Sequence, residues 1–127
     1  MKYGFVLLIL FTALSMGQAQ NIGVTQFQFA TSVENRTPVA VDTTFAPSVG
    51  TVYCFTQIRG AADTTQISHV WYYKDQEKAR IPLDVSSDDW RTWSSKKILN
   101  SWTGRWRVMI EDAEGRVLAS TTFTIRR

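Results

Sequence analysis

Apolar and polar residues alternate along most of the chain beyond residue 20, with the period of a β-strand that buries one face. We predict strands over six ranges: 22–33, 51–58, 66–74, 78–85, 105–111 and 117–125. In the first range, Phe27, Phe29, Thr31 and Val33 are expected on one face. Apolar residues nowhere recur convincingly at the i, i+3, i+4, i+7 spacing of an amphipathic helix. The pattern therefore predicts an all-β protein.

Short polar connections separate these runs. Residues 74–77 and 112–115 are typical of hairpin turns, while 60–63 and 38–47 form longer loops. Pro82 has no N–H to donate to a neighbouring strand, so its run is expected at a sheet edge. The spacing favours an antiparallel, immunoglobulin-like β-sandwich of about six to eight strands. A small β-barrel is the alternative.

The first 19 residues have the pattern of a secretory signal peptide. Lys2 supplies a positive charge, an apolar stretch follows, and small residues occupy positions 17 and 19 before the expected cleavage site. The apolar stretch is 13 residues long, against about 20 for a membrane-spanning helix. We expect a cleaved signal peptide over 1–19, with an uncleaved anchor as the alternative. Residues 20–127 then form a single domain, exported to the periplasm or outside the cell.

Composition excludes several classes of protein. The 127 residues carry a net charge of +3, which is too small to indicate a nucleic-acid binder. One cysteine rules out an internal disulfide framework, and one cysteine with one histidine cannot build a Cys/His zinc site. Cys54 lies in a run with strong strand character, and we expect its thiol to be buried as a small apolar group, with an intermolecular disulfide as the alternative.

The segment 90–110 differs from the rest of the chain. It contains four of the five tryptophans, five basic residues and no acidic residue. Indole faces stack on sugars or guanidinium groups, and arginine binds carboxylate or phosphate. The candidate ligand-binding residues are Trp90, Arg91, Trp93, Lys96, Trp102 and Arg105, with His69 from an earlier run. In the competing interpretation Trp106 and one other tryptophan fill the core, while Arg91, Arg105 and Arg107 lie on a solvated sheet face. We favour the core for Trp106 because it alternates with Val108 and Ile110.

Nothing in the sequence indicates catalysis. His69 is the only imidazole, and neither a G-x-S-x-G nor an H-E-x-x-H motif accompanies it. We expect His69 to be a partly buried, hydrogen-bonded residue of its strand. Adjacent acids such as Asp88 and Asp89 diverge on a strand, which is poor geometry for an acid and base pair. No catalytic residue, metal site or cofactor is therefore predicted, and the protein is not expected to be an enzyme.

Five blocks of sequence, in this order, resemble a known bacterial family. They are 31–38 (TSVENRTP), 52–56 (VYCFT), 69–71 (HVW), 90–96 (WRTWSSK) and 102–108 (WTGRWRV). The chain is similar over about Gly23 to Ile125 to the domain-of-unknown-function family 2914 of bacterial envelope proteins, which more often has an aromatic or aliphatic residue at the position of Cys54. The resemblance implies export and a compact β domain. It supplies no catalytic residue, substrate or cofactor.

Two functions of different classes follow. The first is a non-catalytic binding module of the bacterial envelope that contacts a glycan or an anionic polymer through the Trp/Arg/Lys segment. The second is a structural or assembly protein that pairs with itself or with a membrane-protein partner through an edge strand or apolar patch. Neither involves nucleic acid, or a membrane span once the signal is cleaved. Binding of an anionic ligand should weaken steeply with salt, whereas strand pairing should not.

Overall fold

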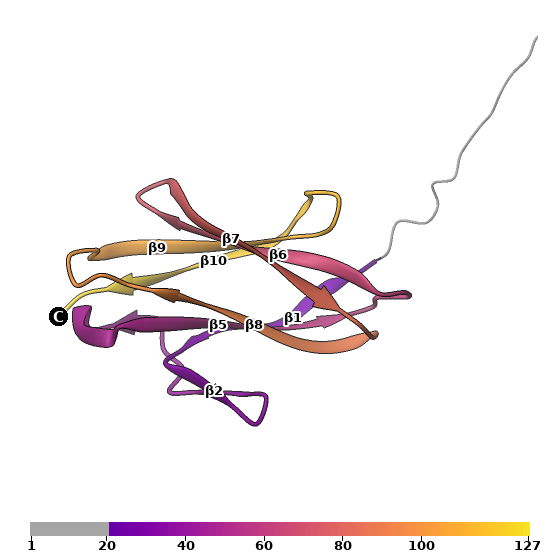
Figure 1. Cartoon of the computed structure of the whole chain (residues 1–127), viewed down its shortest axis with the longest axis horizontal. Coiled ribbons are helices and arrows are strands. Elements are labelled where there is room, and N and C mark those ends of the chain that lie inside the picture. Colours follow the sequence, from indigo (N-terminus) through magenta and orange to yellow (C-terminus); the bar gives the residue numbers. More distant parts are fainter. Residues whose placement is uncertain (1–20) are drawn as a thin grey trace, which may run out of the picture.

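The computed structural model describes residues 21–127, so the predicted signal peptide lies outside the described residues. Two β-sheets pack face to face (Figure 1). The smaller sheet has the strand order β1-β5-β8, with β1 at Gly23–Ala30, β5 at Thr51–Arg59 and β8 at Asp89–Lys97. The larger sheet has the order β4-β10-β9-β6-β7. Its strands are β4 (Thr44–Phe45), β6 (Thr65–Tyr73), β7 (Gln76–Val85), β9 (Gly104–Glu111) and β10 (Val117–Ile125).

The connections follow an immunoglobulin-like plan. The chain crosses from the smaller to the larger sheet after β5 and returns after β7, and all pairings in the two sheets are antiparallel except β4 with β10. Neither sheet closes into a barrel. A hairpin of β2 (Ser32–Glu34) and β3 (Thr37–Val39) and a 3-10 turn at Pro47–Val49 complete the part of the chain that is described. The predicted β-sandwich is confirmed.

All six predicted strand ranges contain a strand, but the first one is shorter than expected. β1 ends at Ala30 and the chain bends at Thr31, so Val33 belongs to the separate hairpin instead of continuing the face of Phe29. The sequence pattern also missed β8 and the short strands β2, β3 and β4. The expected position of Pro82 is confirmed, because β7 pairs with β6 alone and forms an edge of the larger sheet.

Aromatic side chains fill the space between the sheets. The Phe123 ring lies 4.6 Å from the ring of Phe29 and 5.9 Å from that of Trp106, and Trp71 and Trp106 are fully buried. Cys54 belongs to the same cluster and has no exposed surface, and burial raises the pKa of its thiol. The predicted core positions of Trp106 and Cys54 are therefore confirmed.

The β6–β7 hairpin turns within two residues. Lys74 and Asp75 both have positive φ, at 51° and 63°, as the tight turn of a twisted hairpin requires. This confirms the hairpin predicted at residues 74–77. In Figure 1 the β6–β7 turn, the loop between β8 and β9 and the C-terminus lie at one end of the sandwich. The loops 60–64, 86–88 and 112–116 lie at the opposite end.

Candidate binding surface

The two ends of the sandwich carry opposite charge. Seven of the 11 acidic residues lie at or near the end formed by loops 60–64, 86–88 and 112–116, which we call the acidic end; they are Asp63, Asp84, Asp88, Asp89, Glu111, Asp112 and Glu114. Eight of the 14 basic residues lie toward the opposite, basic end: Lys74, Lys78, Lys96, Lys97, Arg105, Arg107, Arg126 and Arg127. The net charge of the chain is only +3, but its positive and negative side chains are concentrated at opposite ends of the sandwich.

The structure separates the seven candidate residues into distinct places. Lys96 and Trp102 meet at the basic end, and Arg105 is the second residue of β9. Trp90, Arg91 and Trp93 lie on β8, in the half nearer the acidic end. His69 is fully buried between the sheets, so its imidazole is not available to a ligand at the surface. The segment 90–110 is therefore not one continuous surface.

At the basic end, two ammonium groups share one indole ring. Lys78 Nζ lies 5.3 Å from the centroid of Trp102, and Lys96 Nζ lies 5.2 Å from it. Within residues 21–127 neither lysine forms an ion pair. Lys78 was not among the predicted residues. It stands at an irregularity where β7 passes from Glu77 to Ala79 opposite β6, a feature that residue alternation does not reveal.

Trp102 is held in a fixed position. Its ring is half-buried against the rings of Tyr73 and Trp106, at centroid distances of 6.0 and 5.7 Å. Its carbonyl accepts a hydrogen bond from Trp106 Nε1 at 3.2 Å, and its N–H donates to the carbonyl of Leu99 at 2.9 Å. Gly104, with φ of 110°, then leads the chain into β9. A ligand that stacks on this indole meets a surface already in place.

Arg105 borders a hollow of about 420 Å³ on the outer face of the larger sheet, toward the basic end. The side chains that line it also include Tyr72, Lys74, Asp75, Arg107 and Thr122. The Arg107 guanidinium stacks 4.3 Å from the centroid of Tyr72. Asp75, the acidic residue of this lining, approaches Arg107 at 4.0 Å with a side chain that is 98% exposed. An ion pair so long and exposed neutralises little of the positive charge.

Trp93 and Trp90 occupy opposite faces of β8. Trp93 stacks on Phe55 on the outer face of the smaller sheet, with centroids 6.0 Å apart and rings inclined by 14°. Trp90 packs toward the core beside Ile58. The Arg36 guanidinium lies 5.6 Å from the centroid of the Trp90 ring. Arg91 Nη1 donates to the Arg36 carbonyl at 3.4 Å. Both rings are half-buried, and contacts within the protein account for much of their surface.

His69 is the centre of a hydrogen-bond chain that joins the two sheets. Its Nδ1 lies 2.6 Å from Ser94 Oγ, and its Nε2 lies 3.2 Å from Thr56 Oγ1. Trp71 Nε1 donates to Ser94 Oγ at 3.1 Å, and Thr56 Oγ1 donates to the carbonyl of Thr92 at 3.0 Å. The expectation of a hydrogen-bonded histidine is confirmed, although its burial is complete rather than partial.

These contacts fix the tautomer of His69. The Thr56 hydroxyl uses its proton on Thr92, so it accepts from His69 Nε2–H. The Ser94 hydroxyl accepts from Trp71 and donates its own proton to His69 Nδ1. Every donor is satisfied when the ring is neutral, and burial lowers the pKa of His69 to about 3. This arrangement stabilises the fold and keeps the imidazole away from solvent.

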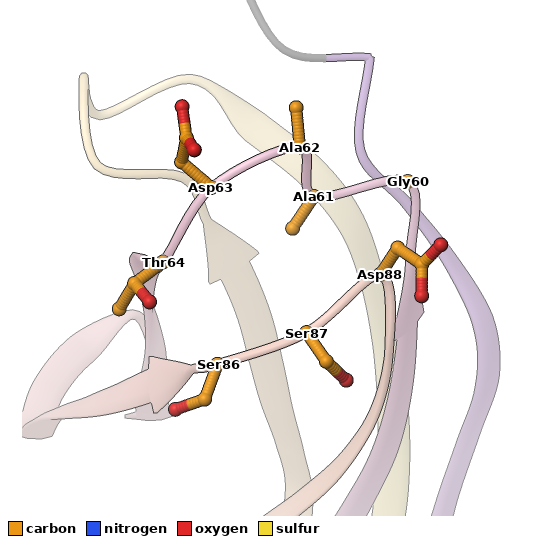
Figure 2. A pocket seen from close by; sticks show the side chains of 8 residues that line it. All are labelled: Gly60, Ala61, Ala62, Asp63, Thr64, Ser86, Ser87 and Asp88. Carbon is orange, nitrogen blue, oxygen red and sulfur yellow. The ribbon is translucent and has the colours of Figure 1, made fainter.

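A second hollow, of about 530 Å³, lies at the acidic end between loops 60–64 and 86–88. Figure 2 shows that the carboxylates of Asp63 and Asp88, on different loops, do not point toward a common centre. No group of three or more His, Cys, Asp or Glu side chains within residues 21–127 has the geometry to hold a metal ion. The polar side chains of this lining are the two carboxylates and the hydroxyls of Thr64, Ser86 and Ser87.

Comparison with known proteins bears on the resemblance seen in the sequence. The family model described as "Protein of unknown function (DUF2914)" matches residues 64–125. The DUF2914 resemblance is confirmed. The matched part comprises β6 to β10, which supply Tyr72, Lys78, Lys96, Trp102 and Arg107 of the basic end. The resemblance seen in the sequence begins earlier, near residue 23, and its first two blocks lie outside the range that the DUF2914 model matches.

The solved structures that the chain matches belong to much longer proteins. Two are the β-glucosidases of Kluyveromyces marxianus and Listeria innocua, each 7% identical with a TM-score of 0.49. The match covers 86% of this chain but only 14% and 16% of theirs, and no functional argument follows from it. No curated protein matches the chain. Within residues 21–127, no helix is long and apolar enough to cross a membrane.

Proposed function

We propose that this protein is an exported, non-catalytic module of the bacterial envelope that binds an anionic polymer at its basic end. One observation carries the proposal: the indole of Trp102 has the ammonium groups of Lys78 and Lys96 within 5.3 Å, and within residues 21–127 no acidic side chain pairs with either. Opposite charge supplied by a ligand would relieve the repulsion between these two cations.

The chemistry of the surroundings supports binding rather than catalysis. The single histidine is buried and neutral, with both ring nitrogens engaged. Trp102 offers a rigid apolar face, and arginines and lysines nearby offer donors that suit carboxylate or phosphate. Export and an envelope location are expected from residues 1–19 and from the resemblance to DUF2914.

The test compares two neighbouring lysines. Lys96→Ser should weaken binding of polygalacturonate about two- to fivefold, which corresponds to one partly exposed ion pair. Lys97→Ser makes the same change in net charge, but Lys97 faces away from the indole and should alter binding by less than about 1.5-fold. Calorimetric titration at several NaCl concentrations gives both affinities, and neutral dextran serves as the uncharged comparison.

Two results would overturn the proposal. Equal losses from Lys96→Ser and Lys97→Ser would mean that net charge, and no defined site, attracts the polymer. Absence of any polyanion binding, together with salt-resistant self-association in ultracentrifugation, would instead support an assembly role through edge strands. The β7 edge carries Lys78, Arg80 and Pro82, which oppose such pairing.

A further inference from the structure

The hollow beside Arg107 has the features of a second anion site. The Arg107 guanidinium is stacked on Tyr72, which leaves the N–H groups at the edge of its plane free to donate. Within residues 21–127 no hydrogen bond is formed by the guanidinium groups of Arg105 or Arg107. A carboxylate placed in the hollow would meet two arginines and Lys74, against the single exposed carboxylate of Asp75.

The hollow and Trp102 are connected around the β6–β7 turn. Lys74 lines the hollow, and its Nζ also lies 5.3 Å from the centroid of Tyr73. The Tyr73 ring is in turn 6.0 Å from the ring of Trp102, where Lys78 and Lys96 lie. Cations and aromatic rings therefore form one continuous row, from the outer face of the larger sheet to the basic end of the sandwich. The β6–β7 turn lies at this end (Figure 1).

This arrangement suits an extended ligand with repeated charges. A single small anion would bind either beside Trp102 or in the hollow, and the cations at the other position would keep their charge without a counterion. Trp102 adds a requirement that charge alone does not satisfy, because an indole face stacks on the apolar C–H face of a sugar ring. Inorganic polyphosphate repeats its charge but has no such face.

We propose that the basic end holds a linear acidic polysaccharide at two connected subsites, one at Trp102 and one in the hollow beside Arg107. This inference rests on the proposed function and specifies its ligand. A chain that reaches both subsites gains from the high effective concentration of its second segment once the first is bound. Affinity should then increase steeply with chain length.

The experiment uses a length series of oligogalacturonates with the purified protein, beginning with the monosaccharide. In the native protein, chains long enough to reach both subsites should bind at least about tenfold more tightly than short ones. Arg107→Ser should remove most of this gain and leave the affinity of short chains nearly unchanged. Lys96→Ser should weaken short and long chains alike. Arg91→Ser, an equal loss of charge on the other sheet, is the matched control and should preserve the length dependence.

A second arm identifies the class of polymer. Trp102→Leu keeps an apolar side chain but removes the stacking face, so it should weaken oligogalacturonate binding and leave polyphosphate binding unchanged. Tighter binding of polyphosphate, with no effect of Trp102→Leu on either probe, would overturn the choice of a polysaccharide. Length-independent binding that still depends on Lys96 would overturn the second subsite while the proposed function stands. No binding of any probe would overturn both.

Discussion

At the scale of single residues, the most constrained group is the imidazole of His69. Its two nitrogens are held by hydroxyls from the opposite sheet, one acting as donor and one as acceptor. A proton added to Nδ1 would face Ser94 Oγ, which already accepts from Trp71 and would then have to give up its own acceptor. The neutral ring is therefore part of the native packing, and its protonation disrupts a buried network.

This predicts a specific loss of stability in acid. The pKa of His69 is lowered from 6.5 to about 3 in the folded protein, so between these values the unfolded chain binds a proton that the folded one does not. The free energy of unfolding should fall by about 1.4 kcal/mol per pH unit as the pH decreases through this window, in addition to the effect of the carboxylates. Urea titrations between pH 7 and 4 measure the slope, and NMR follows the ring. A ring that titrates near pH 6.5 in the folded protein would contradict the prediction.

The partners of individual side chains could be predicted only in part from the sequence. Position in a strand was enough to predict that His69 is hydrogen-bonded and that Trp106 is buried. The partners of His69 come from β5 and β8, at sequence separations of 13 and 25 residues, so no local pattern reveals them. Likewise, Lys78 meets Lys96 only because both approach Trp102 from different strands of different sheets.

At the scale of elements, β8 explains the main failure of the hydrophobic pattern. Its core-facing positions include Thr92, Ser94 and Lys96, whereas the aromatic Trp93 points to the outer face. The inward face of β8 therefore carries an apolar ring at Trp90 but polar side chains at the next positions, and Ser94 is polar because its hydroxyl belongs to the His69 network. A strand with so few apolar residues on its inward face gives little alternation to detect.

The turn between β9 and β10 gives a prediction about one element. Asp112 is 8% exposed and accepts hydrogen bonds from the backbone N–H groups of Glu114 and Arg116, both at 2.9 Å, and from Arg116 Nε at 2.8 Å. Burial acts to raise the pKa of Asp112, but the hydrogen bonds from Arg116 and Glu114 and the charge of Arg116 outweigh it and lower the pKa. Asp112→Ala should therefore cost about 2 kcal/mol of stability in urea unfolding at pH 7.

The control for this change is Glu114→Ala in the same turn. The side chain of Glu114 is 71% exposed and meets Arg116 at 3.4 Å, so its loss should cost less than about 0.5 kcal/mol. The cost of Asp112→Ala should also shrink as the pH falls, since a carboxyl with a lowered pKa contributes stability that is lost on protonation. Equal effects of the two variants at pH 7 would show that the turn does not depend on Asp112.

At the scale of the whole molecule, the separation of charge between the two ends should govern how the protein meets charged surfaces. Lys78→Glu and Arg59→Glu change the net charge equally, but at the basic and acidic ends respectively. If the basic end makes the contact, Lys78→Glu should elute from a cation exchanger at clearly lower salt than Arg59→Glu at the same pH. Identical elution of the two variants would mean that the field of the molecule is effectively uniform.

The hydrogen-bond chain through His69 has a consequence for how the two sheets are aligned. Apolar contacts tolerate small displacements, whereas hydroxyl and ring nitrogen atoms satisfy one another only at one relative position of β5, β6 and β8. A slip of β8 by two residues in one direction would keep its inward face but place Lys96, which has no group that can accept from Trp71, where Ser94 now stands. The hydrogen bonds of the imidazole thus favour one register of β8 over others that hydrophobic packing alone would allow.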